Sequence, residues 1–204
     1  MNAGHERTMM RSVSLAAIAP QAWRNDGGRT RELLCWPSTE DWAVRISVAD
    51  IEADGPFSDF PDVERWFAVI DGAGVTLTFG DTECTTERRV ARGDPPLRFD
   101  GAHGPGCRLV DGPTRDLNLM AHRGRSTMRQ AEPGVAWNEP FAMRGLYAAV
   151  AGRWSGDNDH MDVSAHALLW AEAAAAAAWT FEPGHPSSSV AGWWLGFTPA
   201  GMRR

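Results

Sequence analysis

The chain has 204 residues, of which 43% are hydrophobic and 23% charged, the composition of a folded globular protein rather than a disordered one. Its 26 acidic and 20 basic residues give a formal charge of −6, and no basic block marks a surface for nucleic acid or anionic membrane. All the basic residues are arginine, which excludes mechanisms that need a Schiff-base or phosphate-loop lysine.

The N-terminal region contains two segments of different character. Residues 1–12 are polar, and we expect them to be frayed. The apolar stretch at 13–19 has the order of a secretory signal, but it is short and interrupted by Ser14, so we expect a first strand and a cytoplasmic protein. No apolar run approaches the roughly 20 residues of a membrane-spanning helix, and we expect no membrane partner.

Short strands separated by turn residues dominate the rest of the chain and predict an all-β fold. Apolar and other side chains alternate over 42–49, which is the period of a strand with one apolar face. The runs 66–70 and 75–79 flank a glycine-rich turn and predict a hairpin. We expect further strands at 90, 97–99, 108–110, 117–121, 146–151, 164–170, 178–181 and 193–197.

The polar segment 124–134 is a candidate connector between two halves, 13–123 and 124–204. The alanine-rich stretch 171–178 favours helix by propensity, but it is short and has aromatic, strand-like neighbours, so we expect a strand there. Four tryptophans in this half could pack inside a barrel or form an association surface, and they are Trp170, Trp179, Trp193 and Trp194.

Metal, disulfide and nucleophile signatures are weak. Cys35, Cys84 and Cys107 are widely spaced, and we expect them to be reduced and mostly buried. The six histidines are dispersed. A polar cluster over 157–162, with Asp159 and His160 at its centre, could bind a cation but is more typical of a solvated loop. We therefore predict no metal and no cofactor.

Four segments combine polar and aromatic residues with glycine and proline. They read WRNDGGRTRE over 23–32, DWAVRISVA over 41–49, GPFSDFP over 55–61 and DGPTRDLNLM over 111–120. Gly27 and Gly28 permit close backbone approach. The Gly-Pro and Asp-Gly-Pro turns fix the direction of the strands that follow.

In this order the four segments resemble the HutD/Ves family, whose pattern is roughly W-[KR]-N-G-G-G-x-T-x-E, D-W-x-x-R-x-S-x-A, G-P-F-S-x-F-P-G and D-G-P-x-x-D-x-N-x-M. The similarity covers about 13–123. Two positions depart from it, since Asp26 replaces one glycine of the triplet and Asp62 replaces the glycine after Pro61. The first change affects a loop beside a possible pocket, and the second affects a turn.

The resemblance implies a cupin-like, RmlC-like jelly-roll β-barrel, with two such halves in one chain. HutD proteins are associated with the regulation of histidine utilisation in bacteria and are thought to sense a small acid such as formiminoglutamate or its N-formyl analogue. Ves proteins are named for induction by stress. The implied partner is a small-molecule carboxylate, and the implied state is a monomer or homodimer.

Strand parity predicts which polar side chains could meet such a ligand. Arg45 and Ser47 oppose the apolar face of 42–49, and Arg45 has the forked donors that suit a carboxylate. Asp116, Asn118 and Met120 share one face of their strand. The amide of Asn118 can both donate and accept hydrogen bonds.

Ser58, in the turn after Gly55-Pro56, completes the candidate ligand-binding set of Arg45, Ser47, Ser58, Asp116, Asn118 and Met120. Each has a structural alternative. Arg45 could form a surface ion pair, Asp116 could pin Arg45 or Arg123, and Ser58 could cap backbone groups. A non-catalytic ligand-binding regulator is the preferred function. A metal-independent cupin enzyme acting through Asp116 or Glu32 is the alternative.

Overall fold

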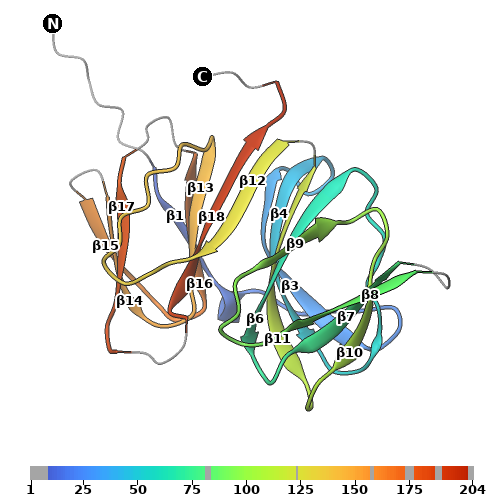
Figure 1. Ribbon diagram of the computed structural model, residues 1–204. Coiled ribbons are helices and arrows are strands. Elements are labelled where there is room, and N and C mark those ends of the chain that lie inside the picture. Colours follow the sequence, from blue (N-terminus) through green and yellow to red (C-terminus); the bar gives the residue numbers. More distant parts are fainter. Residues whose placement is uncertain are drawn as a thin grey trace, which may run out of the picture.

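The structure is a computed structural model that describes residues 9–80, 84–122, 124–156, 159–172, 177–186 and 190–201. The described chain is all-β, with antiparallel strands, one 3-10 turn η1 (Leu15–Ala17) and no α-helix. Its strands form four sheets in two halves that lie side by side (Figure 1).

In the N-terminal half, a six-stranded sheet faces a four-stranded sheet. The order of the larger sheet is β2 (Gln21–Ala22), β3 (Gly28–Pro37), β4 (Trp42–Ile51), β11 (Thr114–His122), β6 (Val63–Asp71) and β9 (Leu97–Asp100). The order of the smaller sheet is β5 (Gly55–Pro56), β10 (Gly106–Leu109), β7 (Val75–Gly80) and β8 (Thr85–Val90). Ile51, Phe67 and Leu77 belong to the apolar cluster between these sheets.

The C-terminal half repeats this plan with fewer strands. The order of its five-stranded sheet is β1 (Arg11–Ser14), β16 (Ala167–Glu172), β13 (Met143–Ala148), β18 (Gly192–Pro199) and β12 (Gly124–Gln130). The order of its three-stranded sheet is β15 (Asp159–Val163), β14 (Gly152–Gly156) and β17 (Trp179–Pro183). Trp154, Trp179, Phe181 and Trp194 belong to the cluster between these two sheets.

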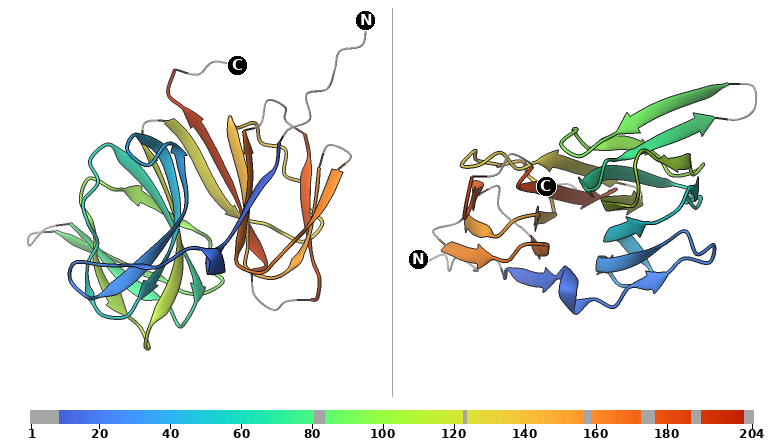
Figure 2. Two further views of the ribbon diagram at one scale, coloured as in Figure 1. Left: turned by 180° about the vertical axis from the view of Figure 1, so that it is seen from behind. Right: turned by 90° about the horizontal axis from the view of Figure 1, so that it is seen from below.

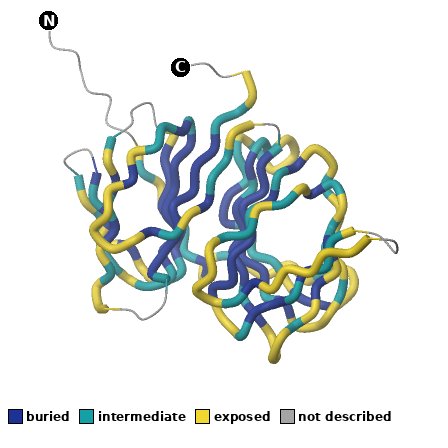
Figure 3. The backbone as a smooth tube through the Cα atoms, in the orientation of Figure 1, coloured by how far each residue is buried: buried dark blue, intermediate teal, exposed yellow. Residues whose placement is uncertain are grey.

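The largest apolar cluster joins the two halves. Val44, Ile46 and Val48 of β4 belong to the same cluster as Leu195 and Phe197 of β18. The buried residues accordingly concentrate in the two sheets that face each other across the middle of the molecule (Figure 3). Because side chains alternate across a strand, this contact turns Arg45 and Ser47 toward the interior of the N-terminal half.

The chain crosses between the halves near its start. β1 pairs with β16 of the C-terminal sheet, and the chain then runs through η1 to the edge of the N-terminal sheet (Figure 2). The expected first strand is therefore present, but it belongs to the sheet of the other half. Arg11 and Ser12 lie in this strand rather than in a frayed end, and residues 1–8 lie outside the described part of the chain.

The predicted hairpin was wrong, because local pattern does not specify the pairing partner. β6 and β7 form no hairpin: β6 pairs with β11 and β9, while β7 pairs with β10 and β8 in the opposite sheet. The predicted polar connector begins with strand β12, which pairs with β18. Gln130 of β12 also donates to the backbone oxygens of Gly93 and Asp94 in the N-terminal half.

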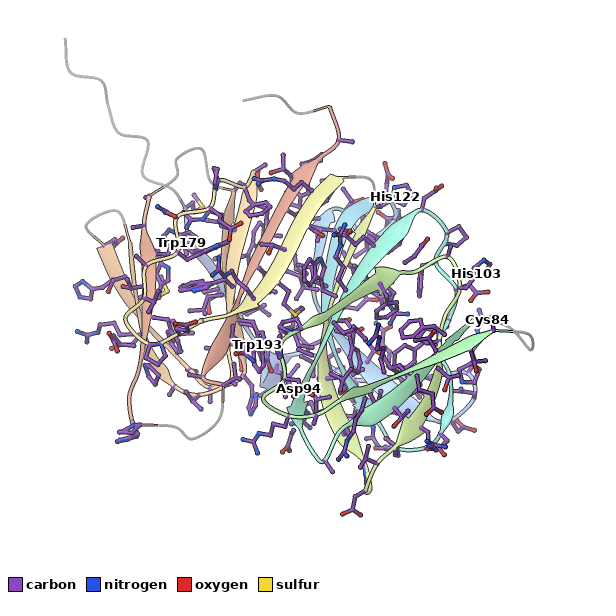
Figure 4. The ribbon with its side chains drawn as sticks, viewed as in Figure 1. Cys84, Asp94, His103, His122, Trp179 and Trp193 are labelled. Carbon is purple, nitrogen blue, oxygen red and sulfur yellow. The ribbon has the colours of Figure 1, made fainter. Side chains whose placement is uncertain are left out.

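The alanine-rich stretch is described only in part. Its first two residues end β16, and 173–176 lie outside the described residues. The four tryptophans considered as an association surface are all buried, so they serve the core. Figure 4 shows Trp179 within the C-terminal half and Trp193 close to the boundary with the N-terminal half.

Candidate functional site

A cavity of about 580 Å³ lies on the inward face of the six-stranded sheet. Residues 21–25, residues 56–58 and Phe60 form other parts of its wall. Its size is in the range of small-molecule sites, and it combines aromatic and polar lining residues as such sites do.

The floor of this cavity is set by the register of β4, β11 and β6. Residues directly opposite one another on neighbouring strands form three successive rows across the sheet. These rows are Arg45–Met120–Arg65, Ser47–Asn118–Phe67 and Ala49–Asp116–Val69.

Five of the six predicted site residues line the cavity: Arg45, Ser47, Ser58, Asn118 and Met120. The sixth, Asp116, is in the third row and does not line it. Its side chain is fully buried, and the Thr114 hydroxyl donates to its Oδ2 over 2.8 Å. The alternation of side chains along β11 therefore predicted the correct face for Asp116, but it did not predict that this residue lies beyond the cavity.

Arg65 is the cavity residue that the sequence prediction missed. It is only 6% exposed, and its Nη2 donates to Asn118 Oδ1 over 3.2 Å. The Ser58 carbonyl is 3.5 Å from its Nη1, and the rings of Phe57, Phe60 and Phe99 lie within 6 Å of its guanidinium carbon. Among the described residues, no carboxylate forms an ion pair with Arg65.

The charge of Arg65 is costly to bury in this position. Burial, together with the nearby positive charge of Arg45, lowers the pKa of Arg65 to about 10. The side chain is still protonated at neutral pH. A buried guanidinium without a carboxylate partner has hydrogen-bond donors that suit an anion.

Arg45 has a counter-ion of its own. Its Nη2 lies 2.6 Å from Glu32 Oε1, and both side chains are largely buried. The Cys35 thiol donates to the other oxygen, Glu32 Oε2, over 3.4 Å. Burial, and then the charge of Glu32, raises the pKa of Cys35 to about 11, so this thiol is not a nucleophile at neutral pH.

The first motif builds the part of the wall next to β3. The Trp23 indole donates to the Thr30 hydroxyl over 2.7 Å, and the Asn25 side chain accepts from the Gly27 amide over 3.2 Å. A Cβ on Gly28 would lie 2.3 Å from the Asp50 backbone oxygen, so only glycine fits at the start of β3. These residues fix the loop that lines the cavity.

Both departures from the family pattern have left-handed backbone conformations. The φ angle is 53° at Asp26 and 62° at Asp62. Glycine adopts such angles without strain, and aspartate tolerates them better than most other residues. Both positions therefore have backbone conformations that glycine would also accept.

No group of three or more histidine, cysteine, aspartate or glutamate side chains is arranged to hold a metal ion within the described part of the chain. Asp159 and His160 lie in β15, whereas Asp157 is outside the described residues. Cys35, Cys84 and Cys107, all among the described residues, form no disulfide, and Cys84 is exposed rather than buried (Figure 4). The described residues include no helix that is long and apolar enough to span a membrane.

Two solved structures share the fold of this chain. The protein is similar to HutD from Pseudomonas fluorescens, with a TM-score of 0.78 and 22% identity over 95% of this chain and all of the other. It is also similar to an oxalate decarboxylase from Bacillus subtilis, with a TM-score of 0.64 and 10% identity over 95% of this chain and 78% of the other. Both likenesses concern the fold alone.

Sequence comparison then identifies the family. The HutD family model matches residues 15–185, and the chain belongs to the HutD family. It is 31% identical to Protein Ves of Cronobacter sakazakii over 151 residues, which are 74% of this chain and 81% of the relative. It is also 32% identical over 100 residues to an uncharacterised 21.2 kDa protein in the hutC 3′ region of Pseudomonas putida, 48% of this chain and 50% of that protein.

Proposed function

We propose that the protein is a non-catalytic, cytoplasmic receptor for a small carboxylate, bound in the cavity of the N-terminal half. The observation that carries this proposal is the buried guanidinium of Arg65, which faces the cavity without a carboxylate partner among the described residues. An incoming carboxylate would supply the missing charge, and exclusion of water would strengthen the interaction.

The rest of the site supports recognition of a small polar acid. Ser47 and Asn118 offer a hydroxyl and an amide in the row next to the two arginines. Phe57 and Phe67, whose ring centroids are 5.7 Å apart, give the same cavity an apolar wall. A flexible acid with a polar amide or formimino group matches this combination of donors and apolar surface.

The biological role that we propose is regulation of histidine utilisation, with formiminoglutamate or formylglutamate as the sensed acid. Membership of the HutD family and the similarity to a protein from a hutC 3′ region support this role. We further propose that each half is a cupin-like jelly roll, so that the chain is a bicupin. We expect no nucleic-acid partner and a monomer or homodimer.

A titration of the purified protein with each acid tests the proposal. We expect saturable binding and a rise in the melting temperature, with the added acid recovered unchanged when the mixture is analysed by mass spectrometry. Absence of binding at millimolar acid would contradict the receptor function. Consumption of the acid would instead favour a metal-independent enzyme.

A further inference from the structure

Glu32 belongs to the first sequence motif but is not among the residues that line the cavity. It lies on β3 directly opposite Ser47 of β4, and its carboxylate is bound to Arg45. Glu32 thus neutralises one of the two cavity arginines from the side of the neighbouring strand.

The charged side chains that line the cavity are three arginines: Arg24, Arg45 and Arg65. Arg24 is exposed, so water and salt screen its charge. The inner end of the cavity, by which we mean the row that contains Arg45 and Arg65, therefore has two guanidinium groups and the single carboxylate that Glu32 brings to Arg45. Asp116 is two rows away from these arginines, does not line the cavity, and accepts a hydrogen bond from the Thr114 hydroxyl.

We propose that Glu32 determines the charge selectivity of this site by restricting the inner end to one net positive charge, so that it accepts a monoanionic head group and rejects a dianionic one. This inference rests on the proposed receptor function and specifies its ligand class. A carboxylate or a sulfate ester compensates Arg65 alone. The second charge of a phosphate monoester would be buried without a partner, which is unfavourable.

Three small probes separate charge from shape. Butanoate and ethyl sulfate each carry one charge, whereas ethyl phosphate carries two at about pH 8 because its second pKa is about 6. Ethyl sulfate and ethyl phosphate have the same tetrahedral head, so the ratio of their affinities reports charge alone. Ligand-observed NMR titration measures this ratio for weakly bound probes.

The wild-type protein is expected to bind butanoate and ethyl sulfate more tightly than ethyl phosphate. In Glu32→Gln the inner end carries two positive charges, and the phosphate-to-sulfate affinity ratio rises at least about tenfold. The matched control is Glu52→Gln, which removes an equal charge from an exposed pair with Arg29 outside the cavity and leaves the ratio unchanged.

Two further variants keep the test decisive if Glu32→Gln alone does not fold. Arg45→Gln leaves the inner end without net charge, so the affinities for all three anions fall. Arg45→Gln combined with Glu32→Gln restores one net charge and returns the ratio to the wild-type value. The inference would be overturned if Glu32→Gln changes the phosphate-to-sulfate affinity ratio no more than Glu52→Gln does. It would also be overturned if the wild-type protein binds ethyl phosphate more tightly than ethyl sulfate.

Failure of the receptor function gives a different result from failure of the inference. If wild-type protein binds none of the three probes, the proposed carboxylate site is contradicted, and the role of Glu32 fails with it. If wild-type protein binds butanoate but the variants leave the ratio unchanged, the receptor function stands and only the role of Glu32 is overturned.

Discussion

Arg65 Nη2 donates to Asn118 Oδ1 over 3.2 Å, which links β6 to β11 on the floor of the cavity. The two residues are 53 positions apart in the chain and occupy adjacent rows of the sheet. This hydrogen bond orients the guanidinium, and it also turns the amide oxygen of Asn118 toward a protein partner. The Asn118 amide nitrogen is then the atom available to donate to a ligand.

Arg65 is predicted to be required for binding but not for folding. Arg65→Met retains most of the side-chain volume and removes a buried charge, so we expect an unfolding free energy equal to or above that of the wild type. Carboxylate affinity should fall at least about thirtyfold, because a charged hydrogen-bond donor is lost. Calorimetric titration and denaturant unfolding measure the two effects.

The control for this substitution is Arg98→Met, which removes an arginine paired with Glu64 outside the cavity. It should leave the affinity unchanged. Equal losses of affinity in the two variants would show that net protein charge, rather than the position of Arg65, attracts the ligand.

Asp116 is predicted to make stability depend on pH. Burial raises its pKa in the folded state, with the Thr114 hydrogen bond opposing the shift, so folding favours the protonated acid. Its contribution to stability is complete below the unfolded pKa of about 4 and is lost as pH rises toward the folded pKa. Asp116→Asn removes this titration, so the stability of the variant relative to wild type should increase as pH rises above about 4.

Denaturant unfolding at a series of pH values checks this expectation. Asp111→Asn provides a control that removes an equal charge from an exposed position. A constant difference between Asp116→Asn and wild type at every pH would show that Asp116 has no raised pKa.

The core between the halves is predicted to make them unfold together. Leu119 is fully buried in the cluster that includes Leu195 and Phe197 of the other half. Leu119→Ala should cost about 2–5 kcal/mol of unfolding free energy while leaving one transition. Six of the ten tryptophans lie at 124–204, so fluorescence is weighted toward the C-terminal half, whereas far-UV circular dichroism reports both halves. Non-coincident transitions would contradict a shared core.

A surface substitution is the control for the stability loss expected in Leu119→Ala. Val110 is exposed, and Val110→Ala should change the unfolding free energy by less than about 0.5 kcal/mol.

Backbone conformation at Asp26 predicts which substitutions its loop accepts. Its φ of 53° is compatible with glycine, so Asp26→Gly should retain the stability of the wild type within about 1 kcal/mol. Asp26→Val places a β-branched residue at a left-handed position and should lower the unfolding free energy by about 1–2 kcal/mol more than Asp26→Gly does. Equal stability of the two variants would refute the left-handed conformation.

The alternation of side chains along two strands predicted which faces of β4 and β11 border the cavity. The alternation in 42–49 and 116–120 correctly placed Arg45, Ser47, Asn118 and Met120 on the face that lines the cavity. Parity specifies a face but not a depth, which explains why Asp116 was grouped with them although it lies in the next row. Only the three-dimensional packing shows that Asn118 borders the cavity whereas Asp116 does not.

Arg65 was missed because the apolar run at 66–70 dominated the interpretation of its strand. A signal was nevertheless present: Arg65 shares its parity with Phe67 and Val69, both buried on the inward face. The false hairpin has a similar origin, because a glycine-rich turn joins two strands of opposite sheets as readily as two neighbours. Long-range pairing partners are absent from local sequence patterns.

The most direct test of the receptor account is a crystal structure of the protein with formylglutamate. The account predicts one carboxylate within hydrogen-bond distance of the Arg65 guanidinium, with Asn118 or Ser47 as a second contact. An acid bound elsewhere, or a carboxylate in the cavity that turns away from Arg65, would contradict it.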